Sequence, residues 1–250
     1  MSTGELRVGV SDGVATVVIA HPAKRNAMTT EMWRELPVLL DGLAADPAVR
    51  ALVLTGEGDT FCAGADIGSL REGADASKGL AVAAEEALAA FPKPTLAEVR
   101  GYCVGGGCQL AAACDLRFAA EDASFGITPA KLGIVYAESS TRRLVRLVGP
   151  ATAKYLLFSG ELIGAERALR TGLVDEVLPA EALGKRVAEF TAVLSRRSQL
   201  TQAAAKEFAD GVADGDRIAQ WEEQMRTSGD TAEGVAAFLE RREPRFTWSV

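Results

Sequence analysis

The chain has 250 residues, of which 48% are apolar and 24% charged, and its formal net charge is −7. This size and composition allow one large core, or a core with a small appendage, and are typical of a soluble globular protein. The acidic balance disfavours nucleic acid or an anionic membrane as the main partner.

The N-terminal residues lack the basic-then-apolar pattern of a signal peptide, and no apolar stretch approaches the roughly 20 residues of a membrane span. A cytoplasmic location is therefore expected. The four cysteines form no CxxC pair, and His21 is the only histidine. We therefore expect neither a zinc site nor a catalytic triad, and we interpret the cysteines as small buried apolar side chains in a reducing compartment.

The first part of the chain predicts a hairpin, a helix and a buried strand. Two apolar runs flank an Asp-Gly turn signal, which is typical of a hairpin. The run of five apolar or β-branched residues from Ala51 to Thr55 predicts a strand buried on both faces. In chain order, the expected elements are strands 6–10 and 14–20, a helix capped by Thr29 or Thr30 and ending near Leu43, strand 51–55, a mobile flap over 68–77, and a helix over 81–90 that ends before Pro92.

The unit of strand, tight turn and helix then repeats, with strand 95–99, a glycine turn, helix 106–114 and strand 116–119. This alternation predicts an α/β arrangement with largely parallel pairing. Beyond residue 150 the pattern is helical, except for a strand over 173–178. We therefore expect an α/β core over 1–195 and a helical region over 196–250, which should pack on the core because no Pro/Ser-rich linker separates them.

Two segments supply bare backbone N–H groups after strand-like runs. The first is the tight turn around Ala63-Gly64-Ala65, and the second is the triple glycine that begins at Gly105. A triple glycine can simply allow close helix packing. The N–H of Gly106, however, would lie in the first turn of a helix, where it has no intrahelical partner and the helix dipole favours negative charge. Two such turns in one core favour a site for an anion or a carbonyl oxygen.

The chain resembles the crotonase superfamily, the enoyl-CoA hydratase/isomerase fold, over nearly its whole length. The likeness rests on four segments in the family's order and spacing: 21–28, 61–67, 93–115 and 153–177. It implies an α/β spiral of repeated ββα units with a helical C-terminal region that builds trimers or dimers of trimers. The implied partner is an acyl-CoA substrate, with no metal or redox cofactor, since coenzyme A enters as part of the substrate.

The resemblance also implies roles for individual residues. The N–H groups of Ala65 and Gly106 fall where the family's oxyanion hole holds the thioester carbonyl. Ala63, Ala65 and Ile67 match the loop that contacts adenine and the pantetheine arm. Lys24 or Arg25 would meet a CoA phosphate, or would be solvated loop charges. Asp66, in the same CoA-contacting segment, matches a position that bonds nearby turns and is not expected to act as a base.

Two departures from the family pattern disfavour efficient hydration. Hydratases of this family carry one glutamate where this chain has Gln109 and a second where it has Pro129. Hydration needs one carboxylate to activate water and another to protonate carbon. The amide of Gln109 can orient water but cannot take its proton, and Pro129 offers no polar group.

The segment 128–136 is similar to a stretch of methylmalonyl-CoA decarboxylase, a crotonase relative in which the tyrosine faces the substrate carboxylate. Tyr136 would then orient a carboxylate, although it is also explained as a packed aromatic residue. The match is partial, because that relative has glutamate at the place of Gln109 and histidine at the place of Ala65. Glu138 lies one residue beyond a position where other crotonases carry an aspartate, so it is a candidate proton shuttle or nucleophile, or else a surface residue that begins the next helix.

These features predict an enzyme that stabilises a thioester enolate between the N–H groups of Ala65 and Gly106. The favoured reaction is decarboxylation of a malonyl-type acyl-CoA. The alternatives are isomerisation through Glu138, hydration of a 2-enoyl-CoA, and a degenerate CoA-binding protein that has lost its chemistry.

Overall fold

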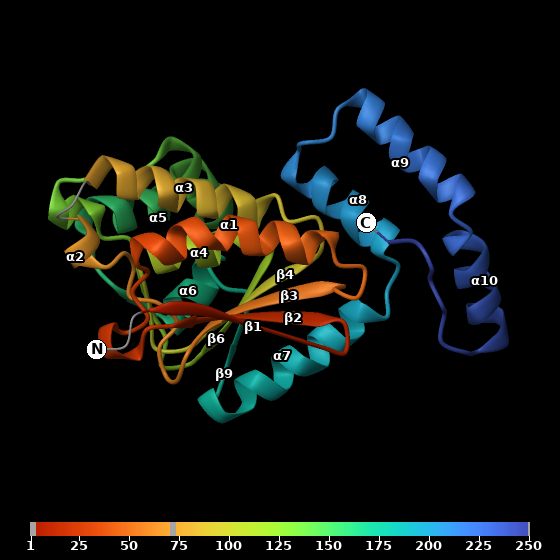
Figure 1. Ribbon diagram of the computed structural model, residues 1–250, viewed down its shortest axis with the longest axis horizontal. Coiled ribbons are helices and arrows are strands. Elements are labelled where there is room, and N and C mark those ends of the chain that lie inside the picture. Colours follow the sequence, from red (N-terminus) through yellow and green to blue (C-terminus); the bar gives the residue numbers. More distant parts are fainter. Residues whose placement is uncertain (1–3, 71–73, 250) are drawn as a thin grey trace.

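Six strands form the main sheet, in the order β1-β2-β3-β4-β6-β9 (Figure 1). The computed structural model describes residues 4–70 and 74–249. β1 and β2 pair antiparallel, as the hairpin signal predicts, and every other neighbouring pair is parallel. The strands are β1 Glu5–Ser11, β2 Val14–Ala20, β3 Ala51–Gly56, β4 Thr95–Val99, β6 Leu116–Ala120 and β9 Glu176–Leu178.

A second sheet of three short strands, in the order β5-β7-β8, packs beside the first and was missed by the sequence analysis. Its strands are β5 Tyr102–Val104, β7 Ser124–Gly126 and β8 Ile163–Gly164. Strands of two or three residues are too short to show an alternating pattern. This sheet matters for the site because β5 leads directly into the triple glycine.

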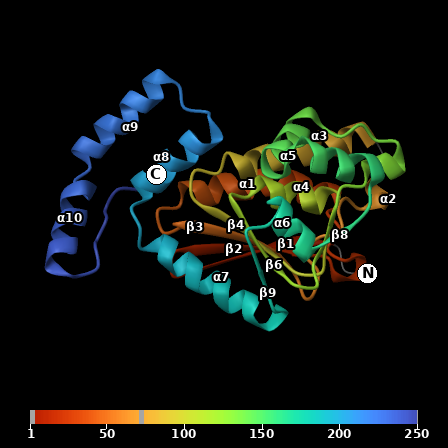
Figure 2. The same cartoon turned by 180° about the vertical axis from the view of Figure 1, so that it is seen from behind.

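Helices cover both faces of the main sheet (Figures 1 and 2). Leu52 and Leu54 of β3 belong to the core cluster that includes α1 and α3, whereas Val53 packs with Leu183 and Val187 of α7. This confirms that β3 is buried on both faces. The helices of the core are α1 Thr30–Ala45, α2 Ile67–Leu70, α3 Ala74–Ala89, α4 Gly106–Ala113, α5 Glu138–Ser159, α6 Ala165–Thr171 and α7 Ala180–Ser195.

The flap expected over 68–77 is wrong for the residues that are described there. Residues 67–70 form α2, and α3 begins at Ala74, seven residues earlier than expected. Residues 71–73 lie outside the described part of the chain. Small residues predict a loop only weakly, because alanine, which occurs at residues 74 and 76, is the strongest helix former.

The C-terminal region consists of α8 Gln199–Asp210, α9 Gly215–Thr227 and α10 Asp230–Glu240. Lys206 of α8 bonds to Asp115 at 3.0 Å, so this helix is packed on the core as expected. By contrast, α9 and α10 extend away from the sheet (Figures 1 and 2). Within the ranges 4–70 and 74–249, no helix combines the length and the apolar character needed to cross a bilayer.

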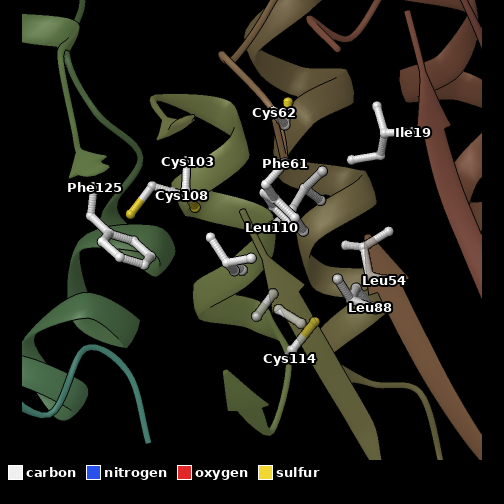
Figure 3. Packing of buried hydrophobic residues seen from close by; sticks show 14 of the residues in the cluster. Ile19, Leu54, Phe61, Cys62, Leu88, Cys103, Cys108, Leu110, Cys114 and Phe125 are labelled. Atoms are coloured by element: carbon white, nitrogen blue, oxygen red, sulfur yellow. The ribbon is translucent and has the colours of Figure 1, made fainter. Parts of the chain in front are cut away.

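All four cysteines are buried and carry free thiols, as predicted (Figure 3). Burial raises the pKa of the Cys62 thiol to about 12, and it raises that of Cys114 to about 12 as well. Since the thiolate is the reactive form, these side chains act as core residues.

Candidate active site

A pocket lies where the loop after β3, the glycine turn after β5, α3 and the loop before α5 meet. Its lining is mostly apolar, and the only formal charge among the described lining residues is that of Lys78. No Asp or Glu belongs to this set. The lining residues are Trp33, Ala63, Gly64, Ala65, Ile67, Lys78, Ala81, Val82, Gly105, Gly106, Gln109, Thr128, Pro129, Leu132, Ile134, Val135, Tyr136 and Ala137.

The backbone hydrogen bonds on either side of Ala65 pair this loop with the segment at Met28, and they leave the N–H of Ala65 pointing away from that segment. Met28 donates to the carbonyl of Gly64 at 2.8 Å and accepts from the N–H of Asp66 at 2.8 Å. In such a parallel bridge the residue between these two partners, Ala65, turns its own N–H to the opposite side. Ala65 itself lines the pocket, so this N–H is available as a donor to a ligand there.

Gly106 is the first residue of α4, so its N–H has no partner within the helix. The preceding Gly105 has φ 56° and ψ −118°, a conformation that only glycine adopts readily. A Cβ built on Gly106 would lie 3.5 Å from the Ala65 nitrogen, and a Cβ on Gly64 would lie 3.4 Å from the Gly106 nitrogen. The structure therefore brings the two predicted donor turns together at one point of the pocket wall.

Close packing explains why the helix begins with glycines. A Cβ on Gly106 would approach the Trp33 ring to 2.9 Å, and a Cβ on Gly107 would lie 2.3 Å from the carbonyl oxygen of Cys62. Cys62 is itself bridged to β5, since its N–H donates to the Tyr102 carbonyl and its carbonyl accepts from the Val104 N–H, both at 2.9 Å. These bonds hold the loop after β3 against the triple glycine.

The loop before α5 supplies the opposite wall. Pro129 and Leu132 are at the ends of a single 3₁₀ turn that finishes at Gly133, with φ 67°. Tyr136 lines the pocket from the end of this loop, and burial raises the pKa of its phenol well above the ordinary value. The phenol therefore stays protonated near neutral pH and can donate a hydrogen bond. Pro129 also lines the pocket and contributes no polar side-chain atom there.

Gln109 lies in α4, one turn beyond Gly106, and its side chain meets a carboxylate that the sequence analysis missed. The Gln109 Nε2 donates to Glu85 Oε2 at 2.5 Å and to Ser140 Oγ at 3.1 Å. Glu85 lies on α3 among apolar residues, and its side chain is 1% exposed. A charged residue within the apolar stripe of a helix was the signal that could have found it.

Of the predicted CoA-contacting residues, Ala63, Ala65 and Ile67 line the pocket. Lys24, Arg25 and Asp66 lie next to the Ala63–Ala65 turn and outside the described lining. Lys24 Nζ pairs with Asp66 Oδ2 at 2.6 Å, and this bond is the main cause that lowers the pKa of Asp66. Asp66 also accepts from the N–H of Gly68 at 3.0 Å, so it bonds nearby turns, as expected. Arg25 lies over the Tyr102 ring, 4.9 Å from its centroid, and its carbonyl accepts from the Ala63 N–H at 3.0 Å. Contact of Lys24 or Arg25 with a CoA phosphate stays a prediction.

Glu138 is not brought to the pocket. It is the first residue of α5, its side chain is 70% exposed, and it forms an ion pair with Arg142 one turn later. It is absent from the described pocket lining. This placement matches the alternative of a surface residue that begins the helix, and a role for Glu138 in proton transfer has no support in the geometry.

Sequence and structure comparisons identify the class of protein. A family model described as enoyl-CoA hydratase/isomerase matches residues 9–248. The 2,3-dehydroadipyl-CoA hydratase of Escherichia coli K12 is 35% identical over 256 residues, which cover 97% of this chain and 98% of that protein. The crotonyl-CoA hydratase of Syntrophomonas wolfei is 35% identical over 244 residues, covering 93% of this chain and 94% of the relative.

A crystal structure described as an enoyl-CoA hydratase/isomerase family member matches with a TM-score of 0.93 and 42% identity, over 100% of this chain and 98% of the other. The enoyl-CoA hydratase structure from Bacillus anthracis matches with a TM-score of 0.88 and 30% identity, over 96% and 98% of the two chains. The fold is thus that of the crotonase enzymes. The chain belongs to the enoyl-CoA hydratase/isomerase family, which confirms the expected fold and superfamily. The likeness of residues 128–136 to methylmalonyl-CoA decarboxylase stays a prediction.

Proposed function

We propose that this protein acts on acyl-CoA thioesters by holding the thioester carbonyl between the N–H groups of Ala65 and Gly106, and that its reaction is decarboxylation of a malonyl-type acyl-CoA. The observation that carries the proposal is the combination of two adjacent donor turns with a pocket lining that includes no carboxylate among the described residues. Such a site can stabilise an enolate but offers no general base.

Decarboxylation is compatible with a site that has two backbone donors and, among its described lining residues, no carboxylate, because the reaction needs no general base. The bond between the α-carbon and the carboxylate carbon breaks, CO₂ leaves, and the electron pair passes into the thioester enolate. The enolate oxygen accepts hydrogen bonds from Ala65 and Gly106, and a solvent proton then adds to the α-carbon. Each donor of this kind typically accounts for about 10²–10³ in rate.

Two side chains support a substrate that carries a carboxylate. The protonated phenol of Tyr136 lines the pocket and can donate a hydrogen bond that orients the carboxylate. Lys78 contributes the only formal charge of the described lining, and its sign favours an anionic acyl group. The apolar residues Leu132, Ile134 and Val135 line the same pocket, and apolar surroundings favour loss of a charged group as neutral CO₂.

Hydration of a 2-enoyl-CoA is the second candidate, because the two relatives described above are named as a 2,3-dehydroadipyl-CoA hydratase and a crotonyl-CoA hydratase. In this chain Gln109 could hold the attacking water, but its amide cannot remove the proton. Simple CoA binding without turnover is a further alternative, whereas isomerisation through Glu138 is disfavoured because that side chain is exposed and lies outside the described lining.

Mass-spectrometric product analysis after incubation with methylmalonyl-CoA and, separately, crotonyl-CoA distinguishes these candidates. Loss of CO₂ from the first with an inert second is the expected result. Water addition to crotonyl-CoA with an inert methylmalonyl-CoA would replace the proposal with hydration, and tight CoA binding without any product would indicate a degenerate paralogue.

We also propose that α8–α10 mediate assembly into trimers or dimers of trimers. Several large apolar side chains on these helices and on the loop between α8 and α9 are exposed in the single chain, and surfaces of this kind mark protein interfaces. They are Phe208, Val212, Met225, Val235, Phe238 and Leu239.

A further inference from the structure

Glu85 lies directly behind the pocket and has no role in the proposed decarboxylation. It follows the pocket-lining residues Lys78, Ala81 and Val82 by seven, four and three positions on α3, so it shares their face of the helix. Its side chain is 1% exposed. Burying an ionised carboxylate is costly unless it is paired and hydrogen-bonded, so its partners decide what it can do.

Three side chains from two other helices satisfy this carboxylate. Arg143 of α5 forms an ion pair with Oε1, while Ser140 of α5 donates a hydrogen bond to Oε2. The Gln109 Nε2 of α4 donates to the same Oε2 at 2.5 Å. Ser140 and Gln109 are buried, and the Arg143 side chain is 20% exposed. The four residues therefore form one compensated cluster across α3, α4 and α5.

This cluster determines which end of the Gln109 amide faces the substrate. An ionised carboxylate accepts hydrogen bonds only, so the amide nitrogen must point toward Glu85. The nitrogen has two hydrogens, and the two bonds, at 2.5 Å to Glu85 and 3.1 Å to Ser140, use both of them. The carbonyl Oε1 is then the group that Gln109 presents to the pocket, which it lines.

We infer that Glu85, together with Ser140 and Arg143, is a positioning residue that fixes the Gln109 carbonyl oxygen as a neutral hydrogen-bond acceptor toward the acyl group. The ligand of this acceptor is an O–H donor, a hydroxyl group of the acyl chain. The inference rests on the proposed acyl-CoA function and specifies one polar subsite within it.

The same geometry predicts that restoring the family's glutamate at position 109 alone would not place a fully ionised carboxylate at the pocket. In a Gln109→Glu variant two carboxylates would lie within hydrogen-bond distance, and like charges that close cannot both ionise, so the pair would keep one proton. In the exchanged variant Glu85→Gln/Gln109→Glu the amide would lie behind and donate to the carboxylate in front, whose second oxygen would face the pocket.

The test compares the dissociation constants of 3-hydroxybutyryl-CoA and butyryl-CoA by titration calorimetry. The two ligands differ by one hydroxyl group, so their ratio isolates the subsite from the rest of CoA binding. We expect the wild-type protein to prefer the hydroxylated ligand by roughly 2- to 10-fold, the effect of one neutral hydrogen bond. Glu85→Gln should lower this ratio to about 1, because the Gln109 amide can then turn over.

Glu86→Gln is the matched control, since Glu86 is the next residue, is exposed, and also contacts Arg143 at 3.3 Å. It should leave the ratio unchanged. The exchanged double variant should restore the preference, which a merely structural role of Glu85 would not do. A folded Glu85→Gln protein with the wild-type ratio, or a folded double variant without the preference, would overturn the inference. Failure of the wild-type protein to bind either thioester would instead refute the proposed function.

Discussion

Removing the backbone N–H of Gly106 tests directly whether this donor takes part in the reaction. Proline at this position has no N–H, and it is tolerated in the first turn of a helix because that N–H has no intrahelical partner. If the Gly106 N–H stabilises an enolate, Gly106→Pro should lower kcat by about 10²–10³, equivalent to about 2.7–4 kcal/mol of transition-state stabilisation.

Proline also adds side-chain atoms, so the comparison needs a matched variant. A Cβ on Gly106 would approach the Trp33 ring to 2.9 Å, a contact that requires the ring to move. Overpacking of this kind typically destabilises a protein by about 1–3 kcal/mol. Gly106→Ala adds the same Cβ but retains the N–H, and it therefore carries most of the steric effect without the loss of the donor.

The assay is kcat for the acyl-CoA that the wild-type protein turns over, with thermal unfolding and CoA binding measured for each variant. We expect both variants to fold and bind CoA, with Gly106→Pro about 10²-fold or more slower than Gly106→Ala. Equal rates in the two variants would show that the Gly106 N–H does not act on the reaction, and the assignment of the oxyanion hole would be wrong.

Three further predictions concern the opposite wall, the exposed acid and the C-terminal helices. Tyr136→Phe should slow decarboxylation by about 10-fold or more through loss of a hydrogen bond to a charged group. Because the pKa of the Tyr136 phenol is raised, the decarboxylation rate of the wild-type protein should not fall as the pH rises through 10. A fall in rate there would contradict the raised pKa. Glu138→Gln should leave kcat unchanged within about two-fold, as for other exposed surface residues, and a large loss would make Glu138 a participant. Phe238→Asp should shift the mass measured by light scattering toward that of the monomer, and an unchanged mass would exclude α10 from the interface.

The fold was largely predictable because its strands and glycine turns have strong local signals. The hairpin before residue 20 follows from two apolar runs around an Asp-Gly turn, and the doubly buried β3 follows from a continuous apolar run. The strands of the small sheet could not be predicted, because two- and three-residue strands have no period. The start of α3 was missed because its small and polar residues carry no apolar stripe.

The candidate site shows the same division. That the Ala63–Ala65 turn and the triple glycine meet was predictable, because both turns depend on small residues at fixed places; the roles of Ala65 and Gly106 as donors to the substrate stay a prediction. Glu85 was not predicted, because its importance depends on Gln109, Ser140 and Arg143, which approach it only when α3, α4 and α5 pack together. Glu138 is close to the pocket in sequence, yet it points to solvent, since the first turn of α5 pairs it with Arg142.

The most direct test of the central claim is the infrared frequency of the thioester carbonyl in bound butyryl-CoA, labelled with ¹³C at that carbon. If Ala65 and Gly106 hold the carbonyl oxygen, the band should shift to lower frequency on binding, and Gly106→Pro should recover part of that shift while Gly106→Ala keeps it. A bound ligand whose carbonyl band stays at its free-solution position in the wild-type protein would contradict the account.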